Sequence, residues 1–221
     1  MITRHFDEEM ELLKQKILRM GAMVEDQISS SIKAMIERDS ELAKKVIEND
    51  HLVNALDVEI DEDALRLLAL HQPAAGDLRF ITTAMKISTE LERMSDLAEN
   101  ISERVTELNE ELQIKPYIDI PKMAERSQKM VAESLDAFVR RDSGLGRKVC
   151  ADDDFVDDLN KQIFRELLSF MIEDPRFIST AIRISFISKY LERIADHATN
   201  IAELAVYLVE GKIIRHTDKI W

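Results

Sequence analysis

Two short acidic patterns, about a hundred residues apart, are the part of this chain best suited to chemistry. Leu-Glu-Arg-x-x-Asp places Glu92 four residues before Asp96, and the same pattern returns with Glu192 and Asp196. On a helix, a spacing of four puts both carboxylates on one side, on neighbouring turns. Each pair is therefore either a solvated acidic face or half of a metal site that binds through oxygen atoms.

A second set of oxygen donors precedes each pair. Asp50 and Asn54 are four residues apart in the first half of the chain, and Asp153 and Asp157 take the equivalent positions in the second. Consecutive antiparallel helices lie about 8–10 Å apart, so side chains on facing edges can share an ion. Oxygen donors without thiolates suit Mg²⁺, Mn²⁺, Ca²⁺ or oxygen-ligated iron better than a structural zinc. The sequence thus predicts two four-donor clusters, one in each half.

Long amphipathic helices must position these donors. Apolar residues recur at steps of three and four with charged residues between them, and the chain has only 5 glycines and 4 prolines, which is typical of long helices joined by short turns. The pattern predicts six helices: five at about residues 6–39, 40–70, 77–108, 123–141 and 143–172, and a sixth that follows the break at Glu173-Asp174-Pro175 and ends near Glu210. Asp39 or Ser40 is expected to cap the second helix, Asp77 to cap the third, and Gly211 to end the sixth.

The helical pattern is itself duplicated. Arg38-Asp39-Ser40 returns as Arg141-Asp142-Ser143, and the segment 115–121, with two prolines, has no helical period. We therefore expect an all-α protein of two tandem, duplicated antiparallel three-helix bundles, with residues 1–114 as the first repeat and 115–221 as the second.

Charge and composition exclude several classes of function. Lys+Arg 30 against Asp+Glu 43 gives a net charge of −13, which repels nucleic acid. No apolar run is long enough to span a bilayer, and the N-terminus has no apolar signal segment, so we expect a cytoplasmic protein without direct membrane insertion. The lone Cys150 cannot form an internal disulfide and is interpreted as a packing residue.

Other interpretations of the acidic pairs stay open. Acids four apart are common on exposed helices, and Arg93 can pair with Asp96 as Arg193 can with Asp196. A metal-storage or redox protein is the alternative function, but a di-iron enzyme of ferritin type needs two Glu-x-x-His motifs. Glu48-Asn49-Asp50-His51 is one, and the second half has Asp154 in place of the histidine.

The chain resembles the PhoU family of phosphate-signalling regulators over nearly its whole length. The resemblance rests on the duplicated plan, on the doubled Leu-Glu-Arg-x-x-Asp, and on three further stretches: Gln72-Pro73 with Gly76-Asp77-Leu78-Arg79, Lys115-Pro116-Tyr117, and residues 190–198. It implies a cytoplasmic, often dimeric, non-enzymatic regulator that represses the phosphate-starvation response. Such a protein acts between the ATPase subunit of the phosphate ABC transporter and a PhoR-type histidine kinase.

The resemblance also implies metal ions or multinuclear iron clusters held by Glu/Asp-x-x-x-Asp motifs, with iron, Mg, Mn or Zn as candidates. Carried onto this sequence, the motif falls on Glu92/Asp96, Glu192/Asp196 and Asp153/Asp157, with Asn100 and Asn200 as additional ligands one turn further on. Asn54 departs from the motif because an amide is a weaker donor to a hard cation than a carboxylate. The sequence therefore favours the second-half site over the first for metal binding.

Overall fold

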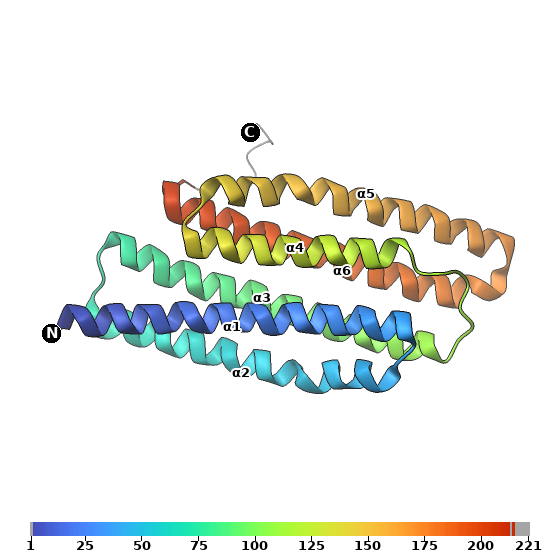
Figure 1. Cartoon of the computed structure of the whole chain (residues 1–221), viewed down its shortest axis with the longest axis horizontal. Helices are drawn as coiled ribbons and strands as arrows, with labels where there is room; N and C mark the ends of the chain where they lie inside the picture. Colours follow the sequence, from blue (N-terminus) through green and yellow to red (C-terminus); the bar gives the residue numbers. More distant parts are fainter. Residues whose placement is uncertain (1, 213, 215–221) are drawn as a thin grey trace.

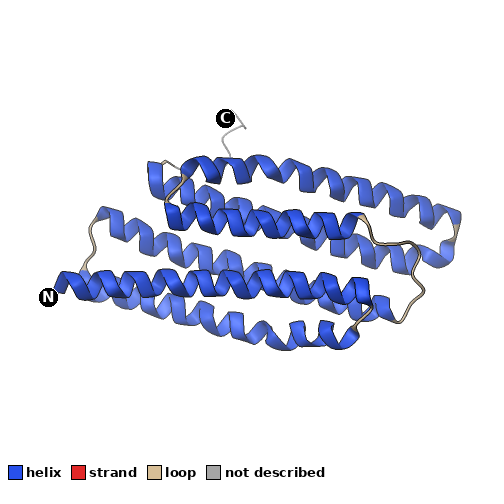
Figure 2. Ribbon diagram, viewed as in Figure 1, coloured by secondary structure: helices blue, strands red, loops and turns tan. Residues whose placement is uncertain are grey.

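The structure, a computed structural model, describes residues 2–212 and 214 of the chain. These residues form six long α-helices and one short 3₁₀ helix, joined by short turns. No strand occurs within these residues (Figure 2). The predicted all-α class and the number of helices are confirmed. The elements are α1 Ile2–Glu37, α2 Ser40–His71, α3 Ala75–Asn109, α4 Asp119–Arg140, α5 Ser143–Glu173, η1 Pro175–Phe177 and α6 Ile178–Glu210.

The helices form two antiparallel three-helix bundles that lie side by side. In Figure 1, α1, α2 and α3 form one bundle and α4, α5 and α6 the other, with α2 and α5 at the two outer edges. Between the bundles, α1 packs against α4 and α3 against α6. This arrangement places α2 beside α3 and α5 beside α6, the helix pairs that carry the predicted metal ligands.

One continuous hydrophobic core runs through both bundles. Leu91 and Met94 of α3, like Leu191 and Ile194 of α6, are fully buried and belong to the same apolar cluster. Close packing of α5 on α6 depends on Gly146, since a Cβ atom there would lie 2.9 Å from the backbone oxygen of Ala202. The division at residue 114 stays a prediction, because the two halves share their core.

Short side chains fix the turns between helices. The Asp39 carboxylate accepts hydrogen bonds of 3.0 Å from the backbone N–H groups of Glu41 and Leu42, and Asp142 accepts one of 2.9 Å from Leu145. These are N-caps, and they satisfy backbone donors that have no partner within the helix. The predicted cap at Asp39 is thus confirmed and recurs at Asp142 in the repeated turn, and the predicted end of α6 at Gly211, which has φ 68°, is confirmed as well.

Three predicted helix starts are wrong, the first being that of α1, which begins at Ile2 rather than at Phe6. α3 begins at Ala75 with Ala74 as its N-cap, so Asp77 lies within the first turn, where its charge is favourable to the helix dipole. α4 begins at Asp119 rather than Met123. Pro121 is tolerated there because the first-turn N–H groups have no helical partner in any case.

The ends of α3 and α6 join the two bundles through charged groups. The Arg183 guanidinium lies 2.7 Å from Glu107 and 3.0 Å from Glu111, and Thr180 Oγ1 donates a 2.5 Å hydrogen bond to Glu111. Among the described residues, no helix has the length and apolar character needed to cross a membrane.

Candidate metal centre

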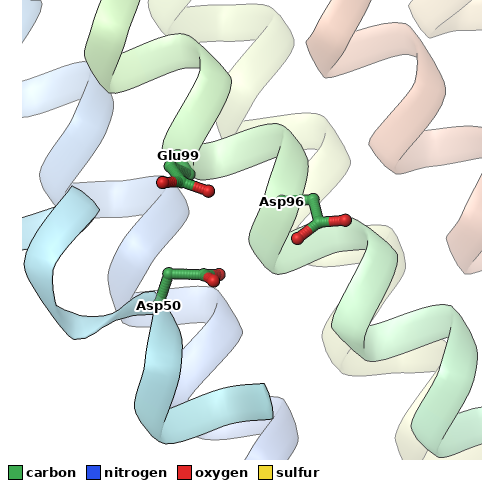
Figure 3. Close-up of side chains that lie close together, drawn as sticks. All are labelled: Asp50, Asp96 and Glu99. Carbon is green, nitrogen blue, oxygen red and sulfur yellow. The ribbon is translucent and has the colours of Figure 1, made fainter.

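Three carboxylates from two helices meet in the first bundle. Asp50 of α2 and Asp96 and Glu99 of α3 each offer an oxygen atom, and these three atoms all lie within 4.8 Å of one another. Figure 3 shows Asp50 facing the two α3 side chains across the space between the helices. A spacing of four places Asp50 and Asn54 on the α3 side of α2, and spacings of three and four place Asp96, Glu99 and Glu92 on neighbouring turns of α3.

Asp50 is held by hydrogen bonds from two helices, α2 and α3. It is buried, its Oδ1 accepts a 2.7 Å hydrogen bond from Ser95 Oγ, and its Oδ2 accepts one of 2.7 Å from Asn54 Nδ2. Ser95 Oγ also lies 2.7 Å from Gln27 Oε1 of α1. These contacts fix the orientation of the carboxylate at the bottom of the cluster, where an ion would need it.

One polar atom beside the cluster has its hydrogen-bonding capacity unused. Asn54 Oδ1 is buried and has no hydrogen-bond partner among the described residues. An orphaned buried carbonyl oxygen costs free energy, and a cation is a group that would satisfy it. Asn54 therefore fits the predicted role of fourth oxygen donor, although its amide nitrogen is committed to Asp50.

The electrostatics of the cluster favour a cation. Burial and the nearby Asp50 carboxylate raise the pKa of Asp96, and burial, Asp50, Glu103 and Asp96 raise the pKa of Glu99. Burial and the surrounding acids, Asp96 first, raise the pKa of Glu92 as well, against the lowering effect of Arg93. Like charges held this close repel one another, and a bound cation would remove the repulsion. The donor set of three carboxylates and an amide oxygen fits a hard cation such as Mg²⁺, Mn²⁺ or Ca²⁺, or oxygen-ligated iron.

The other predicted first-half ligand is engaged elsewhere. Asn100 Nδ2 donates a 2.5 Å hydrogen bond to the backbone oxygen of Asp96, one turn earlier on the same helix. Its amide nitrogen is thereby satisfied within α3.

The second bundle repeats part of this arrangement. Burial, Glu192 and Asp157 raise the pKa of Asp196, so these three predicted ligands are close enough to interact. Burial, Glu203 and Asp153 together raise the pKa of the Cys150 thiol to about 12. Among the described residues, these second-half acids do not converge as tightly as Asp50, Asp96 and Glu99.

Three substitutions explain the difference between the bundles. Ala195 and Met130 stand where Ser95 and Gln27 orient Asp50 in the first bundle, and Thr199 replaces Glu99. In addition, the Lys189 ammonium contacts Glu192 and already neutralises part of its charge, whereas Thr89 takes that position in α3. The sequence favoured the second site, but the geometry favours the first.

Asn200 lies in a different network from its predicted partners. Its Nδ2 donates a 3.0 Å hydrogen bond to Glu90 Oε2, which also lies 2.7 Å from His197 Nδ1. Glu90 belongs to α3, so this buried network joins the two bundles. Although burial opposes it, the pKa of Glu90 is lowered by the hydrogen bonds from His197 and Asn200 and by the charges of His197 and Arg93.

Glu99 is the candidate ligand that the sequence did not predict. The signal was present, because Glu99 stands three residues after Asp96 and therefore on the same side of the helix. Glu99 does not recur in the second half, where Thr199 occupies the matching position, so the duplicated pattern does not include it.

Comparison with known proteins places this fold and its acidic pairs in a family. The model of the PhoU domain matches the chain twice, at residues 17–105 and 120–205. The chain belongs to the PhoU family. The two matched copies of the PhoU domain contain the α2/α3 and α5/α6 pairs that carry the acidic motifs.

Relatives in the PhoU family match along nearly the whole chain. A phosphate-specific transport system accessory protein PhoU homolog of Aquifex aeolicus is 44% identical over 209 residues, 95% of each chain. The PhoU of Escherichia coli K12 is 36% identical over 215 residues, 97% of this chain and 89% of the relative. The crystal structure of PhoU from Pseudomonas aeruginosa superposes with a TM-score of 0.90 at 42% identity, covering 94% of this chain and all of that one.

Proposed function

We propose that this protein is a non-enzymatic regulator of phosphate uptake and signalling that represses the phosphate-starvation response. The observation that carries the proposal is the match of two PhoU domains along a chain whose relatives are named phosphate-specific transport system accessory proteins. In this role the protein works by contact with partners, and the acids of α2 and α3 serve as ligands rather than as proton donors.

The proposed partners are the ATPase subunit of the phosphate ABC transporter and a PhoR-type histidine kinase, met in the cytoplasm by a homodimer of this chain. Exposed apolar side chains support docking on other proteins. Phe164, Leu168 and Ile172 recur at steps of four on α5 and remain 53%, 44% and 77% exposed. The matching α2 positions are Asp61, Leu65 and Ala69, so α2 has a charged residue and a smaller side chain where α5 has Phe164 and Ile172.

A metal ion at Asp50, Asn54, Asp96 and Glu99 would join α2 to α3 and fix the shape of that face. The second-half acids Asp153, Asp157, Glu192 and Asp196 are proposed as a weaker site. Storage or redox chemistry gains no support from the geometry. His51, the histidine of the lone Glu-x-x-His motif, is exposed, and its Nδ1 lies 2.6 Å from the backbone oxygen of Glu48 in its own helix.

Deletion of the protein from its own bacterium tests the proposal. With phosphate in excess, a reporter of the starvation response should be expressed constitutively in the deletion strain and repressed again when the wild-type chain is restored. Capture of the ATPase subunit and of the kinase by the purified protein tests the adaptor role directly. Normal repression in the deletion strain would contradict the proposed function.

A further inference from the structure

Two histidines converge on one carboxylate where α1 begins and α2 ends. His71 Nε2, at the last residue of α2, lies 2.8 Å from Glu9 Oε2. His5 Nε2, one turn before Glu9 on α1, lies 3.8 Å from Glu9 Oε1. The imidazole rings have their centroids 6.4 Å apart and lie edge to face. Two histidines from two helices thus contact one carboxylate, outside the acidic cluster, but the ligand atoms of the three residues do not all lie within 4.8 Å of one another.

We propose that His5, Glu9 and His71 form a binding site for a divalent transition-metal ion of the Zn²⁺ and Ni²⁺ class. Two imidazole nitrogens and one carboxylate are the donors that such ions prefer, whereas Mg²⁺ and Ca²⁺ prefer oxygen alone. The spacing of His5 and Glu9, four residues on one helix, presents both ligands on the same side. The site therefore differs in chemistry from the cluster of Asp50, Asp96 and Glu99.

Little movement separates this arrangement from coordination. Metal–nitrogen and metal–oxygen bonds of about 2.0–2.2 Å require ligand atoms roughly 3–3.5 Å apart, so His71 Nε2 and Glu9 Oε2, now hydrogen-bonded at 2.8 Å, need to separate only slightly. Their side chains are only 14% and 15% exposed, and the Phe6 ring, 5.0 Å away, packs against His71. The His5 side chain is 69% exposed and is free of close packing, so its rotation can supply the remaining approach.

The charges around the three ligands are compatible with a cation. Arg66 Nε lies 3.9 Å from Glu9 Oε1, which opposes binding, but the same guanidinium is 2.8 Å from Asp63. Lys16, the other cation nearby, lies 2.7 Å from Asp63 and 3.1 Å from Glu59. Both basic groups are thus neutralised by acids of α2, and the Glu9 carboxylate keeps its charge available for the ion.

The proposed site has no counterpart in the second bundle. Asp174, at the position that matches His71, caps the short helix η1 by accepting a 2.9 Å hydrogen bond from the Arg176 backbone. One ion of this class per chain is therefore expected at a histidine-containing site.

Calorimetric titration of the untagged full-length chain with Ni²⁺ tests the proposal. Asp96→Asn serves as background, because it weakens the oxygen cluster and leaves the histidines intact. We expect one Ni²⁺ per chain in that background, and at least about tenfold weaker binding after His71→Gln, since loss of an imidazole ligand removes one of three protein donors. The glutamine amide can still donate to Glu9, which preserves the contact between α1 and α2.

Two further variants complete the test. His5→Gln alters an exposed side chain, so it should weaken Ni²⁺ binding without lowering the unfolding temperature, whereas His51→Gln, the matched control on α2, should leave binding unchanged. Equal Ni²⁺ affinity in the background protein and in its His5→Gln and His71→Gln derivatives would overturn the proposal, as would the absence of binding.

Discussion

Replacing one acid of the oxygen cluster should change stability in opposite directions with and without metal. In Asp96→Asn the side chain keeps its size and loses its charge. The oxygen atoms of Asp50, Asp96 and Glu99 lie within 4.8 Å of one another. At that separation, two unit charges repel by about 0.9 kcal/mol in water and by about 3.5 kcal/mol at an effective dielectric constant of about 20. Asp96 and Glu99 are partly exposed, so the gain from removing the Asp96 charge should be about 1–2 kcal/mol.

Thermal unfolding in the presence of a chelator measures this gain. For a chain of this size, about 1–2 kcal/mol corresponds to a rise in unfolding temperature of about 2–8 °C at neutral pH. The pKa of Asp96 is raised in the folded protein, so the stability that its protonation confers is complete at acidic pH and is lost as the pH rises through that pKa. The advantage of Asp96→Asn over wild type should therefore shrink as the pH is lowered.

Metal should reverse the order. An ion at about 100 times its dissociation constant adds about 2.7 kcal/mol to the stability of wild type, and Asp96→Asn should lose most of that increment. Mn²⁺ titrations followed by unfolding temperature make the comparison. Glu62→Gln, an exposed acid about three turns from Asp50 on α2, is the control and should respond to Mn²⁺ as wild type does. If Mn²⁺ stabilised Asp96→Asn as much as wild type, the cluster would not be the site.

Three other outcomes are expected. His197→Ala should lower the free energy of unfolding measured in denaturant by about 2–4 kcal/mol, because it removes a partner of the buried Glu90 carboxylate, and Glu90→Gln should lower it by less. Because the pKa of Glu90 is lowered, the stability that comes from its ionised form is present at neutral pH and is lost as the pH falls through that pKa. Glu90→Gln should therefore reduce the loss of stability in acid. Phe164→Asp should leave the unfolding temperature within about 2 °C of wild type, because the Phe164 ring is exposed. The same substitution should weaken capture of the transporter ATPase subunit or of the kinase. Unchanged capture of both partners would show that α5 is not part of the docking surface. Gly146→Ala should lower the free energy of unfolding by about 1–2 kcal/mol, because the clash of the added methyl group with the α6 backbone outweighs the better helix propensity of alanine. In the control Gly21→Ala the added methyl group meets a leucine side chain that can rotate, so the free energy of unfolding should change by less than about 1 kcal/mol.

Most of the fold could be predicted because local rules determine it. Apolar residues at steps of three and four indicated all six helices, and the capping aspartates Asp39 and Asp142 marked two turns correctly. The errors at Asp77 and Met123 lie at helix starts, where a proline or an acid is as acceptable inside the first turn as before it.

The candidate site was predictable only in part. Spacing on a single helix identified Asp50 and Asp96, but Glu99 escaped a search based on repetition. Asn200 could not be assigned, because its partner Glu90 stands 110 residues earlier in the chain. That contact depends on how α3 packs against α6, which no local pattern in the sequence records.

The network of Glu90, His197 and Asn200 makes the interface between the two bundles asymmetric. In a perfectly duplicated protein, exchange of the two halves would leave the interface between α3 and α6 unchanged. Here the positions equivalent to Glu90 and His197 are Tyr190 and Leu97, so the buried ion pair forms once rather than twice. The two bundles are therefore chemically distinguishable at the interface that they share, because α3 supplies the acid and α6 the histidine.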